Sequence, residues 1–220
     1  MVLLRAVPRW DPQAEERLRA AAIELYLERG FENVTVTQIA GRAGLTRRTF
    51  SRYFADKRDV LFAGSEQLPA ALAEALLGVD PGLSPFEALL RALTEVGAVL
   101  ADRVVLHAAE RRAVIAGSSE LQERGRTKFA AVADALVAAL RQRGMEASGA
   151  RLLADVGVAI FRTGFDRWVD SPEDADLAAR IGEAAGELAG AVSPLLTPTF
   201  PRNVHSVEGI RNHAAEANNG

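Results

Sequence analysis

The sequence of 220 residues contains no cysteine, only three histidines and few aromatic residues. Without cysteine, disulfide frameworks, thiolate nucleophiles and cysteine-based zinc sites are excluded. No uninterrupted apolar segment reaches the roughly 20 residues that a membrane span needs. The opening residues 1–5 are too short for the apolar region of a signal peptide. We therefore expect a cytoplasmic protein with no membrane partner.

Motifs typical of enzymes are also missing. His205 and His213 lie in a weakly patterned tail, and His107 stands in no recognisable metal-ligand motif. We find neither a phosphate-cradling glycine loop nor a nucleophile elbow. An enzyme remains an alternative, because histidines and carboxylates can in principle support acid–base or metal chemistry. The sequence favours a protein that is not an enzyme and has no cofactor and no metal ion.

The residues that are abundant indicate helices. Hydrophobic residues make up 49% of the chain, with much alanine and leucine and few β-branched runs, so we expect an all-α fold of about nine helices. A first helix is expected from Pro12, capped by Asp11, to a stop at Gly30. Thr35 and Gln38 have the spacing of a capping box that begins a second helix.

A very short turn joins the second helix to a third. Gly44 can end the second helix in the left-handed conformation that glycine adopts cheaply. After only Leu45, a new cap residue, Thr46, begins the third helix. Leu45 and Phe50 have the spacing of a hydrophobic staple, which would fix the direction of that helix. The pattern predicts a helix-turn-helix.

Downstream, we expect a fourth helix that begins at its cap, Asp56, runs to about Leu76 and is kinked at Pro69, connecting two domains. Cap residues and apolar spacing place five further helices. These lie near residues 85–101, 103–116, 120–143, 149–170 and 172–193.

The chain is long enough for a small domain fused to a larger one. We expect a three-helix helix-turn-helix domain at residues 1–58, followed by a larger helical domain at residues 59–196 that binds a ligand and forms a dimer. The tail at residues 197–220 is polar and weakly patterned, so we expect it to be flexible.

The charge of the chain is unevenly distributed. The net charge is −3, yet residues 38–58 contain six basic residues against the single acid Asp56. A local basic patch on an acidic protein fits a short-range phosphate contact, because salt screens charges beyond about 8–10 Å. A solvated helix face is the alternative interpretation of the charge alone.

The stretch from Thr35 to Lys57 resembles the N-terminal domain of the TetR family of regulators. It joins a Thr-capped helix with Ile-Ala, an Ala-Gly turn, a second short Thr-capped helix and the pattern Tyr-Phe-x-x-Lys. Residues 12–62 carry the resemblance. Arg48 stands where the family often has a small residue, and Ser51 where it often has an aromatic that touches DNA. The resemblance implies a DNA-binding transcriptional regulator, with repression as the family default.

The third helix would enter the major groove with its first turn toward the base edges. Arg47 and Arg48 are the candidates for base contacts, where one bidentate Arg–guanine pair gives about 1–3 kcal/mol of discrimination. Phosphate contact is their alternative role. The resemblance assigns phosphate contacts to both threonines at the start of the second helix, to Tyr53 and to Lys57; capping and packing are alternatives for the threonines and Tyr53. The predicted DNA-binding residues are Thr35, Thr37, Arg42, Thr46, Arg47, Arg48, Thr49, Arg52, Tyr53 and Lys57.

A homodimer is expected on functional grounds. A single recognition helix reads only a few bases, and twofold dimers place two such helices about 34–36 Å apart. The family resemblance pairs the last two helices of each subunit into a four-helix bundle, and packing within one subunit is the alternative. The small residues that would permit close approach are Gly157, Gly164, Ala184, Ala185, Gly186, Ala189 and Gly190.

The resemblance also implies a cavity for a small, largely apolar effector that releases the protein from its operator. Ordinary core packing is the alternative role of the aromatic residues. The segment from Thr46 to Phe62 resembles a branch that responds to acyl-CoA-like ligands. A ligand-independent DNA-binding or architectural factor is the alternative function. The predicted ligand-binding residues are His107, Arg111, Phe129, Phe161, Phe165 and Trp168.

Overall fold

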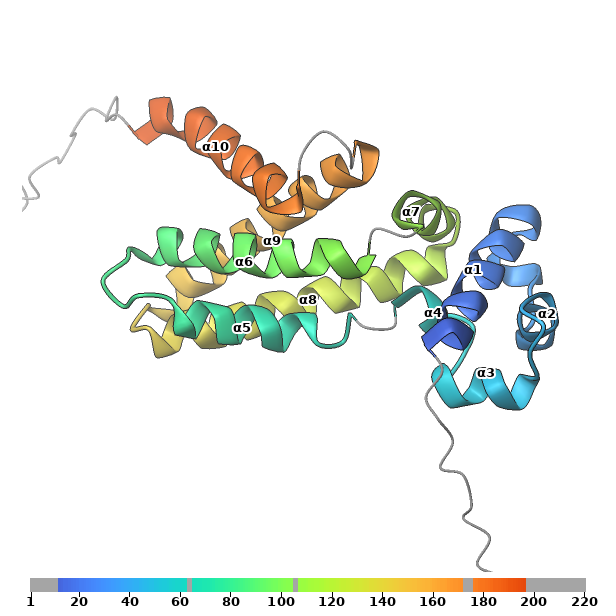
Figure 1. Cartoon of the computed structure of the whole chain (residues 1–220). Coiled ribbons are helices and arrows are strands. Elements are labelled where there is room, and N and C mark those ends of the chain that lie inside the picture. Colours follow the sequence, from blue (N-terminus) through green and yellow to red (C-terminus); the bar gives the residue numbers. More distant parts are fainter. Residues whose placement is uncertain (1–11, 63–64, 105–106, 172–175, 197–220) are drawn as a thin grey trace, which may run out of the picture. The chain divides into compact units, whose positions relative to one another are not determined.

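The computed structural model describes residues 12–62, 65–104, 107–171 and 176–196. The described residues are all-helical and contain no strand, which confirms the predicted fold class. Described residues up to Ala185 belong to one compact unit, and α10 continues into a second. The helices are α1 (Pro12–Arg29), η1 (Phe31–Asn33, 3-10), α2 (Val36–Arg42), α3 (Arg47–Tyr53), α4 (Asp59–Phe62), α5 (Leu68–Gly78), α6 (Pro85–Val104), α7 (Ala108–Ala116), α8 (Ser119–Gln142), α9 (Ala147–Asp170) and α10 (Leu177–Leu196) (Figure 1).

Helices α1, α2 and α3 form the predicted helix-turn-helix. The Thr35 hydroxyl accepts from the Gln38 amide while the Gln38 side chain accepts from the Thr35 amide, so the capping box is confirmed. Gly44 has a φ of +66°, as the short turn requires. The Thr46 hydroxyl accepts from the Thr49 amide at 3.1 Å and caps α3.

An apolar cluster holds these helices together. Phe50 and Phe54 of the α3 region are almost fully buried, with ring centroids 5.4 Å apart. They pack in the same cluster as Leu18 and Tyr26 of α1 and Ile39 of α2. Because Phe50 and Phe54 occupy the inner face of α3, the first turn of that helix is left facing outward.

The predicted fourth helix is wrong in one respect: it is two helices, α4 and α5. Asp56 caps α4 as expected, since its Oδ1 accepts from the Asp59 amide at 2.9 Å. Pro69 lies in the first turn of α5 and does not kink a continuous helix. A proline has no N–H for an internal helical bond, and the first turn is the place where that bond is not needed.

The later helices lie close to their predicted positions, except that α7 begins at Ala108 and not at residue 103, because α6 continues to Val104. The described part of α10 begins at Leu177, and the Asp176 carboxylate accepts from the Ala179 amide at 2.6 Å. The predicted start at residue 172 and the capping aspartate of the first helix lie outside the described residues, as does the tail from residue 197.

Close helix packing explains two of the small residues. A Cβ on Gly164 of α9 would lie 2.8 Å from the backbone of Ile181 in α10. A Cβ on Gly157 would lie 2.8 Å from the Leu89 side chain in α6. Both glycines therefore serve packing within one chain. By contrast, a Cβ on Gly186 or Gly190 would meet no atom within 4 Å.

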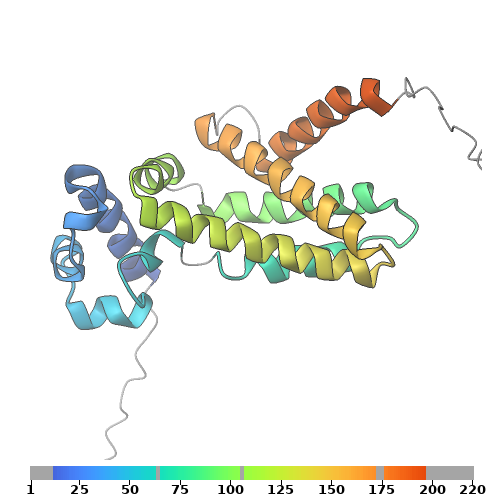
Figure 2. The same cartoon turned by 180° about the vertical axis from the view of Figure 1, so that it is seen from behind.

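The helix-turn-helix is joined to the helices that follow it. α8 and α9 run side by side in both views (Figures 1 and 2), and α8 also packs on α5 and α7. Val114 of α7 and Leu121 of α8 belong to the same buried cluster as α1 to α4. A boundary after residue 58 stays a prediction, because this apolar cluster continues across it.

Candidate DNA-binding surface and ligand cavity

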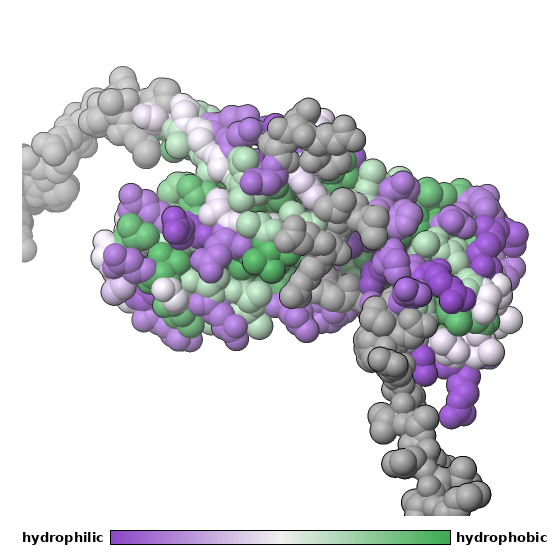
Figure 3. All heavy atoms as spheres, viewed as in Figure 1, coloured by the Kyte–Doolittle hydropathy of each residue, from purple (hydrophilic) through white to green (hydrophobic). Residues whose placement is uncertain are grey.

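The first turn of α3 presents two arginines to the outside. Arg47 and Arg48 are both exposed, and neither has a side-chain hydrogen bond or ion pair with a described residue. Hydrophilic side chains project at the edge of the molecule where α3 lies (Figure 3). Ser51, one turn further along, is also exposed. The cap at Thr46 and the buried Phe50 fix the direction in which both arginines point.

Arg42, in contrast, is paired within the protein. Its guanidinium contacts Glu28 through two bonds of 2.9 Å and Glu24 at 3.2 Å, which ties α2 to α1. The hydrogen bond from Arg42 holds the pKa of the Glu28 carboxyl below its ordinary value. The prediction that Arg42 contacts DNA stays untested, but its guanidinium already has carboxylate partners.

Lys57 also has internal partners. Its ammonium donates to the carbonyl oxygens of Phe31 at 2.9 Å, Val34 at 3.1 Å and Glu32 at 3.3 Å. It also lies 4.2 Å from the centre of the Phe31 ring. An ammonium has three donors, and three carbonyl oxygens surround this one. Lys57 therefore fixes the loop after α3 onto the turn between α1 and α2.

The remaining predicted side chains are exposed or form local contacts within the helix-turn-helix. Arg52 donates to the Tyr53 hydroxyl at 2.9 Å and lies 4.9 Å from the centre of that ring. The hydroxyls of Thr46 and Thr49 are 3.0 Å apart. Thr37 is exposed in the first turn of α2. Thr35 and Thr46 act as caps, and their contact with DNA stays a prediction.

Ion pairs connect the loop after α3 to α8. Arg58 donates to Asp56 at 2.6 Å and to Glu120 of α8 at 2.8 Å. Arg124, one turn along α8, lies 3.4 Å from Asp59. Burial raises the pKa of Asp56, but the hydrogen bonds from the Arg58 side chain and from backbone amides outweigh it and lower that pKa overall. Ion pairs from two successive turns of α8 thus reach the loop after α3 and the start of α4.

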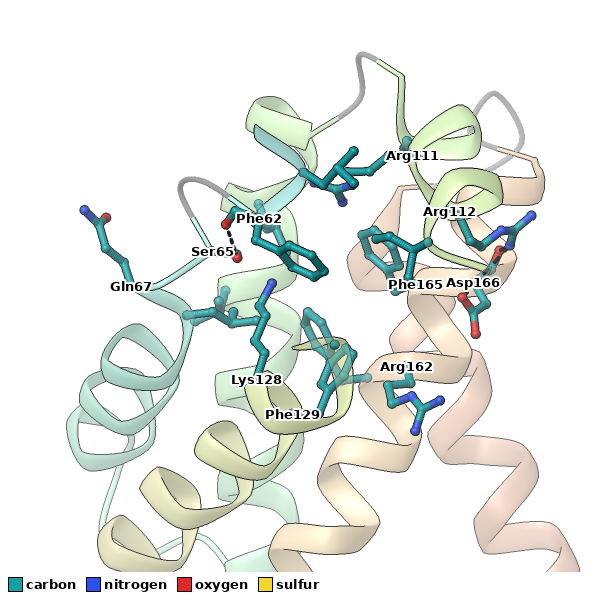
Figure 4. A pocket seen from close by; sticks show the side chains of 18 of the residues that line it. Phe62, Ser65, Gln67, Arg111, Arg112, Lys128, Phe129, Arg162, Phe165 and Asp166 are labelled. Carbon is teal, nitrogen blue, oxygen red and sulfur yellow. Dashed lines mark hydrogen bonds and ion pairs between the residues drawn. The ribbon is translucent and has the colours of Figure 1, made fainter. Parts of the chain in front are cut away.

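A cavity of about 540 Å³ lies among α1, α4, α5, α6, α7, α8 and α9. Its volume is in the range of pockets that hold drug-sized molecules. Most of the residues that line it are apolar, and Figure 4 shows lining side chains from several helices. Leu61 and Phe62 of α4 and Ile23 of α1 belong to it, so the DNA-binding part supplies some of the lining.

Four of the six predicted ligand-binding residues line this cavity: Arg111, Phe129, Phe161 and Phe165. Trp168 is buried in the core, and His107 precedes α7 with a φ of +61°; neither lines the cavity. The Trp168 ring lies 5.8 Å from the ring of the cavity residue Phe165 at an interplanar angle of 49°, so Trp168 supports this part of the wall.

Lys128 lines the cavity and was missed by the sequence interpretation. It is half-buried on α8, beside the predicted Phe129. The sequence signal that could have found Lys128 is the four-residue spacing of Glu120, Arg124 and Lys128, which places three charged residues on one face of α8. The first two form ion pairs with Arg58 and Asp59.

Two further searches cover only the part of the chain that the structure describes. No group of three or more histidine, cysteine, aspartate or glutamate residues lies close enough there to hold a metal ion. No described helix is long and apolar enough to cross a membrane.

Residues 18–63 match the sequence family described as "Bacterial regulatory proteins, tetR family". The putative mycofactocin biosynthesis transcriptional regulator MftR of Mycobacterium tuberculosis is 33% identical over 109 residues, which cover 50% of this chain and 54% of that protein. The HTH-type transcriptional regulator TcmR of Streptomyces glaucescens is 33% identical over 84 residues, covering 38% and 37%. The chain thus spans about half the length of the first of these relatives, and less of the second.

Solved structures share the fold. SmeT, the repressor of the Stenotrophomonas maltophilia multidrug efflux pump SmeDEF, matches with a TM-score of 0.52 at 22% identity, over 80% of this chain and 89% of that one. The transcriptional regulator FadR from Bacillus subtilis, in complex with stearoyl-CoA, matches with a TM-score of 0.52 at 19% identity, over 79% and 96%. At these identities the likeness shows the fold alone.

Residues 18–63, which contain the helix-turn-helix, are thus similar to the N-terminal domain of bacterial regulators of the TetR family.

Proposed function

We propose that this protein is a DNA-binding transcriptional regulator, a repressor that leaves its operator when a small, largely apolar molecule occupies the cavity. The observation that carries the proposal is the first turn of α3, where Arg47 and Arg48 are exposed and have no partner among the described residues. A recognition helix needs such side chains, because a hydrogen-bond donor can contact a base edge only when it is not already bonded within the protein.

The fixed geometry of α3 supports the proposal. Phe50 and Phe54 bury one face of the helix, and the Thr46 cap sets where it begins. A short helix held in this way can lie in the major groove with its N-terminal residues at the base edges. The exposed Thr37 and the Arg52–Tyr53 pair would then contact the phosphate backbone beside it.

A homodimer is the assembly that this function needs. Two copies of α3 must be spaced by about 34–36 Å to read successive major grooves. The exposed small residues Gly186, Ala189 and Gly190 of α10 leave room for a helix of a second copy. Leu152 of α9 is 68% exposed and adds apolar surface. A monomeric mass by light scattering at micromolar concentration would contradict this assembly.

Ligand control is supported by the composition of the cavity wall. The wall includes Arg19 and Ile23 of α1 and Phe62 of α4, which belong to or adjoin the DNA-binding part. Arg19 also donates to the Val60 carbonyl at 2.9 Å. A ligand in the cavity would therefore touch the helices that position α3. A ligand that binds the DNA-bound and DNA-free arrangements of these helices with different affinities shifts the DNA affinity.

The DNA-binding proposal is tested by selecting duplexes from a random library with the full chain, then measuring affinity by fluorescence anisotropy. We expect a twofold-symmetric site with half-sites about 10 base pairs apart. The double variant Arg47→Ala/Arg48→Ala should lose selective binding. The matched control is Arg126→Ala, an exposed arginine on α8 that pairs only with Glu123 in its own helix. Equal binding by both variants, with folding confirmed by circular dichroism, would overturn the proposal.

Ligand control is tested separately, by a thermal-shift screen of apolar and amphiphilic molecules. Each molecule that raises the melting temperature is then added to the protein–operator complex. We expect at least one to release the DNA. If molecules that bind the cavity leave operator binding unchanged, the alternative of a ligand-independent DNA-binding factor is selected.

A further inference from the structure

Most of the residues that line the cavity are apolar, but its charged lining residues are mainly basic. Asp166 is its one acidic lining residue, and its carboxylate faces Arg112. Arg112 is also paired with Asp170, and Arg19 with Glu15. The five basic lining residues are Arg19, Arg111, Arg112, Lys128 and Arg162.

Arg111 and Lys128 have no such partners. Neither side chain forms a hydrogen bond or an ion pair with any described residue, and both are half-buried. The carboxyl group that acts on Lys128 is that of the exposed Glu66, which is not within ion-pair distance. Because an unpaired buried cation costs free energy, a pair of them facing one cavity indicates a binding role.

The two cations converge on the same space from different helices. Figure 4 shows Arg111 extending inward from α7 and the Lys128 ammonium pointing into the cavity from α8, beside Phe62. Arg112, the next residue along α7, points away toward Asp166. Arg111 and Lys128 therefore direct two positive charges at the same space, and the charge of Arg111 acts on Lys128.

Burial acts on both groups in the same direction. It lowers the pKa of Lys128 to about 8, with the charge of Arg111 adding to the effect. It lowers the pKa of Arg111 to about 10, with Arg19 adding to it. Both groups still carry a proton at neutral pH, and an anion placed between them would relieve the repulsion and the lost hydration.

Beyond the two cations the wall is aromatic and aliphatic. Phe161 and Phe165 have nearly parallel rings with centroids 6.5 Å apart, and Phe129 lies beside them on α8. Such a surface binds a hydrocarbon chain or ring through burial of apolar area.

We propose that the effector of this cavity is an amphiphile whose acidic headgroup, a carboxylate or a phosphate monoester, lies between Arg111 and Lys128 while its apolar part covers Phe129, Phe161 and Phe165. The inference rests on the proposed function, in which the cavity is the effector site. It names the chemistry of the ligand and assigns Lys128, together with Arg111, to the headgroup.

The test compares three probes with the same chain: laurate, dodecyl phosphate and the uncharged 1-dodecanol. Their affinities for the full-length protein are measured by isothermal titration calorimetry at pH 7. We expect at least one acid to bind 10-fold or more tightly than the alcohol. The tighter of laurate and dodecyl phosphate identifies the headgroup.

Two variants locate the headgroup. Arg111→Met and Lys128→Met keep an unbranched apolar stem but remove the charge, so each should reduce the affinity for the acid at least 5-fold and leave that for dodecanol unchanged. Arg126→Met, which removes a paired surface charge two residues from Lys128, is the matched control and should bind like the wild type. Circular dichroism shows that each variant is folded.

The inference is overturned if no acid binds more tightly than dodecanol, or if both cavity variants retain the preference for the acid. Its failure can be told from failure of the proposed function. If dodecanol binds as well as the acids and releases operator DNA, the cavity controls DNA binding and only the headgroup inference is wrong. If an acid binds through Arg111 and Lys128 but leaves operator binding unchanged, the headgroup inference stands and ligand control is wrong.

Discussion

The basic residues of the helix-turn-helix and those of the cavity differ in where they find their partners. In residues 38–58, Arg42, Lys57 and Arg58 are bound to carboxylates or carbonyl oxygens of the same chain. Arg47 and Arg48 have no such partner in the described part of the chain and are exposed. In the cavity, Arg111 and Lys128 lack partners among the described residues although they are half-buried.

The difference teaches that a count of basic residues does not locate an anion site. A paired cation contributes to the fold and must leave its partner before it can bind DNA. An exposed unpaired cation is solvated by water, so it costs little and can bind an anion. A buried unpaired cation loses its hydration, so its presence destabilises the fold until an anion binds. The three kinds should therefore respond differently to the same neutral substitution.

The largest effect is expected from Lys57→Met, because the ammonium group of this lysine donates to three carbonyl oxygens. The substitution keeps the packed stem but leaves three carbonyl oxygens without the ammonium donor. Bonds to charged groups contribute more than neutral ones, so we expect a loss of about 3 kcal/mol in the free energy of unfolding. Urea denaturation followed by circular dichroism measures it. An unchanged unfolding midpoint together with weaker DNA binding would mean that Lys57 acts on phosphate.

Arg47→Ala and Arg48→Ala should leave the stability unchanged and weaken operator binding. An arginine that reads a base should cost about 1–3 kcal/mol of binding free energy and relax the preference at one position of the site. One that contacts phosphate should weaken binding to all sequences alike and reduce the salt dependence by about one ion. Anisotropy titrations of operator and scrambled duplexes at several salt concentrations separate the two roles.

Local signals in the sequence predicted the helix-turn-helix well. The caps at Thr35 and Thr46 each accept from an amide three residues along the chain, and Gly44 acts through its own backbone conformation; all three are confirmed. The same kind of signal misled at Pro69, because a proline fits both a kink and a first turn, and only the surrounding packing decides.

The roles of charged side chains were much less predictable. Arg42 finds its partners on α1, at Glu24 and Glu28, and Lys57 finds carbonyl oxygens more than 20 residues away. Lys128 was missed because a lysine on an amphipathic helix is usually solvated, and its burial depends on α4, α5 and α7 coming together above it. Helical spacing gives the face on which a charge lies but not what packs over that face.

Lys128→Met should stabilise the ligand-free protein, in contrast to Lys57→Met. Removing an unpaired buried charge removes its desolvation cost, and we expect a gain of about 1–2 kcal/mol at pH 7. Because the pKa of Lys128 is lowered from 10.5 to about 8, this cost is complete below pH 8 and declines as the pH rises toward 10.5. The charges of Arg111 and Glu66 also act on Lys128, and that of Arg19 acts on Arg111. Arg126→Met, which removes a positive charge outside the cavity, is therefore measured as a control.

The unfolding midpoints of the two variants, taken at pH 7 and pH 9, test this expectation. Lys128→Met should exceed the wild type at pH 7 by a margin that shrinks at pH 9, while Arg126→Met should follow the wild type at both. A loss of stability in Lys128→Met would show that the lysine has a partner in solution, and would remove the contrast between the two groups of cations.

The smallest effect is expected from Arg42→Met, which breaks exposed ion pairs. Arg42 holds the pKa of Glu28 below its ordinary value, so the pair stabilises the fold above that value and stops doing so as the pH falls through the lowered pKa. We expect a small decrease in the urea midpoint at pH 7 that disappears in 1 M salt, since exposed pairs are screened. Operator affinity should be unchanged, because the guanidinium is occupied by Glu24 and Glu28. A marked loss of DNA binding at unchanged stability would move Arg42 from the paired cations to those that bind the operator.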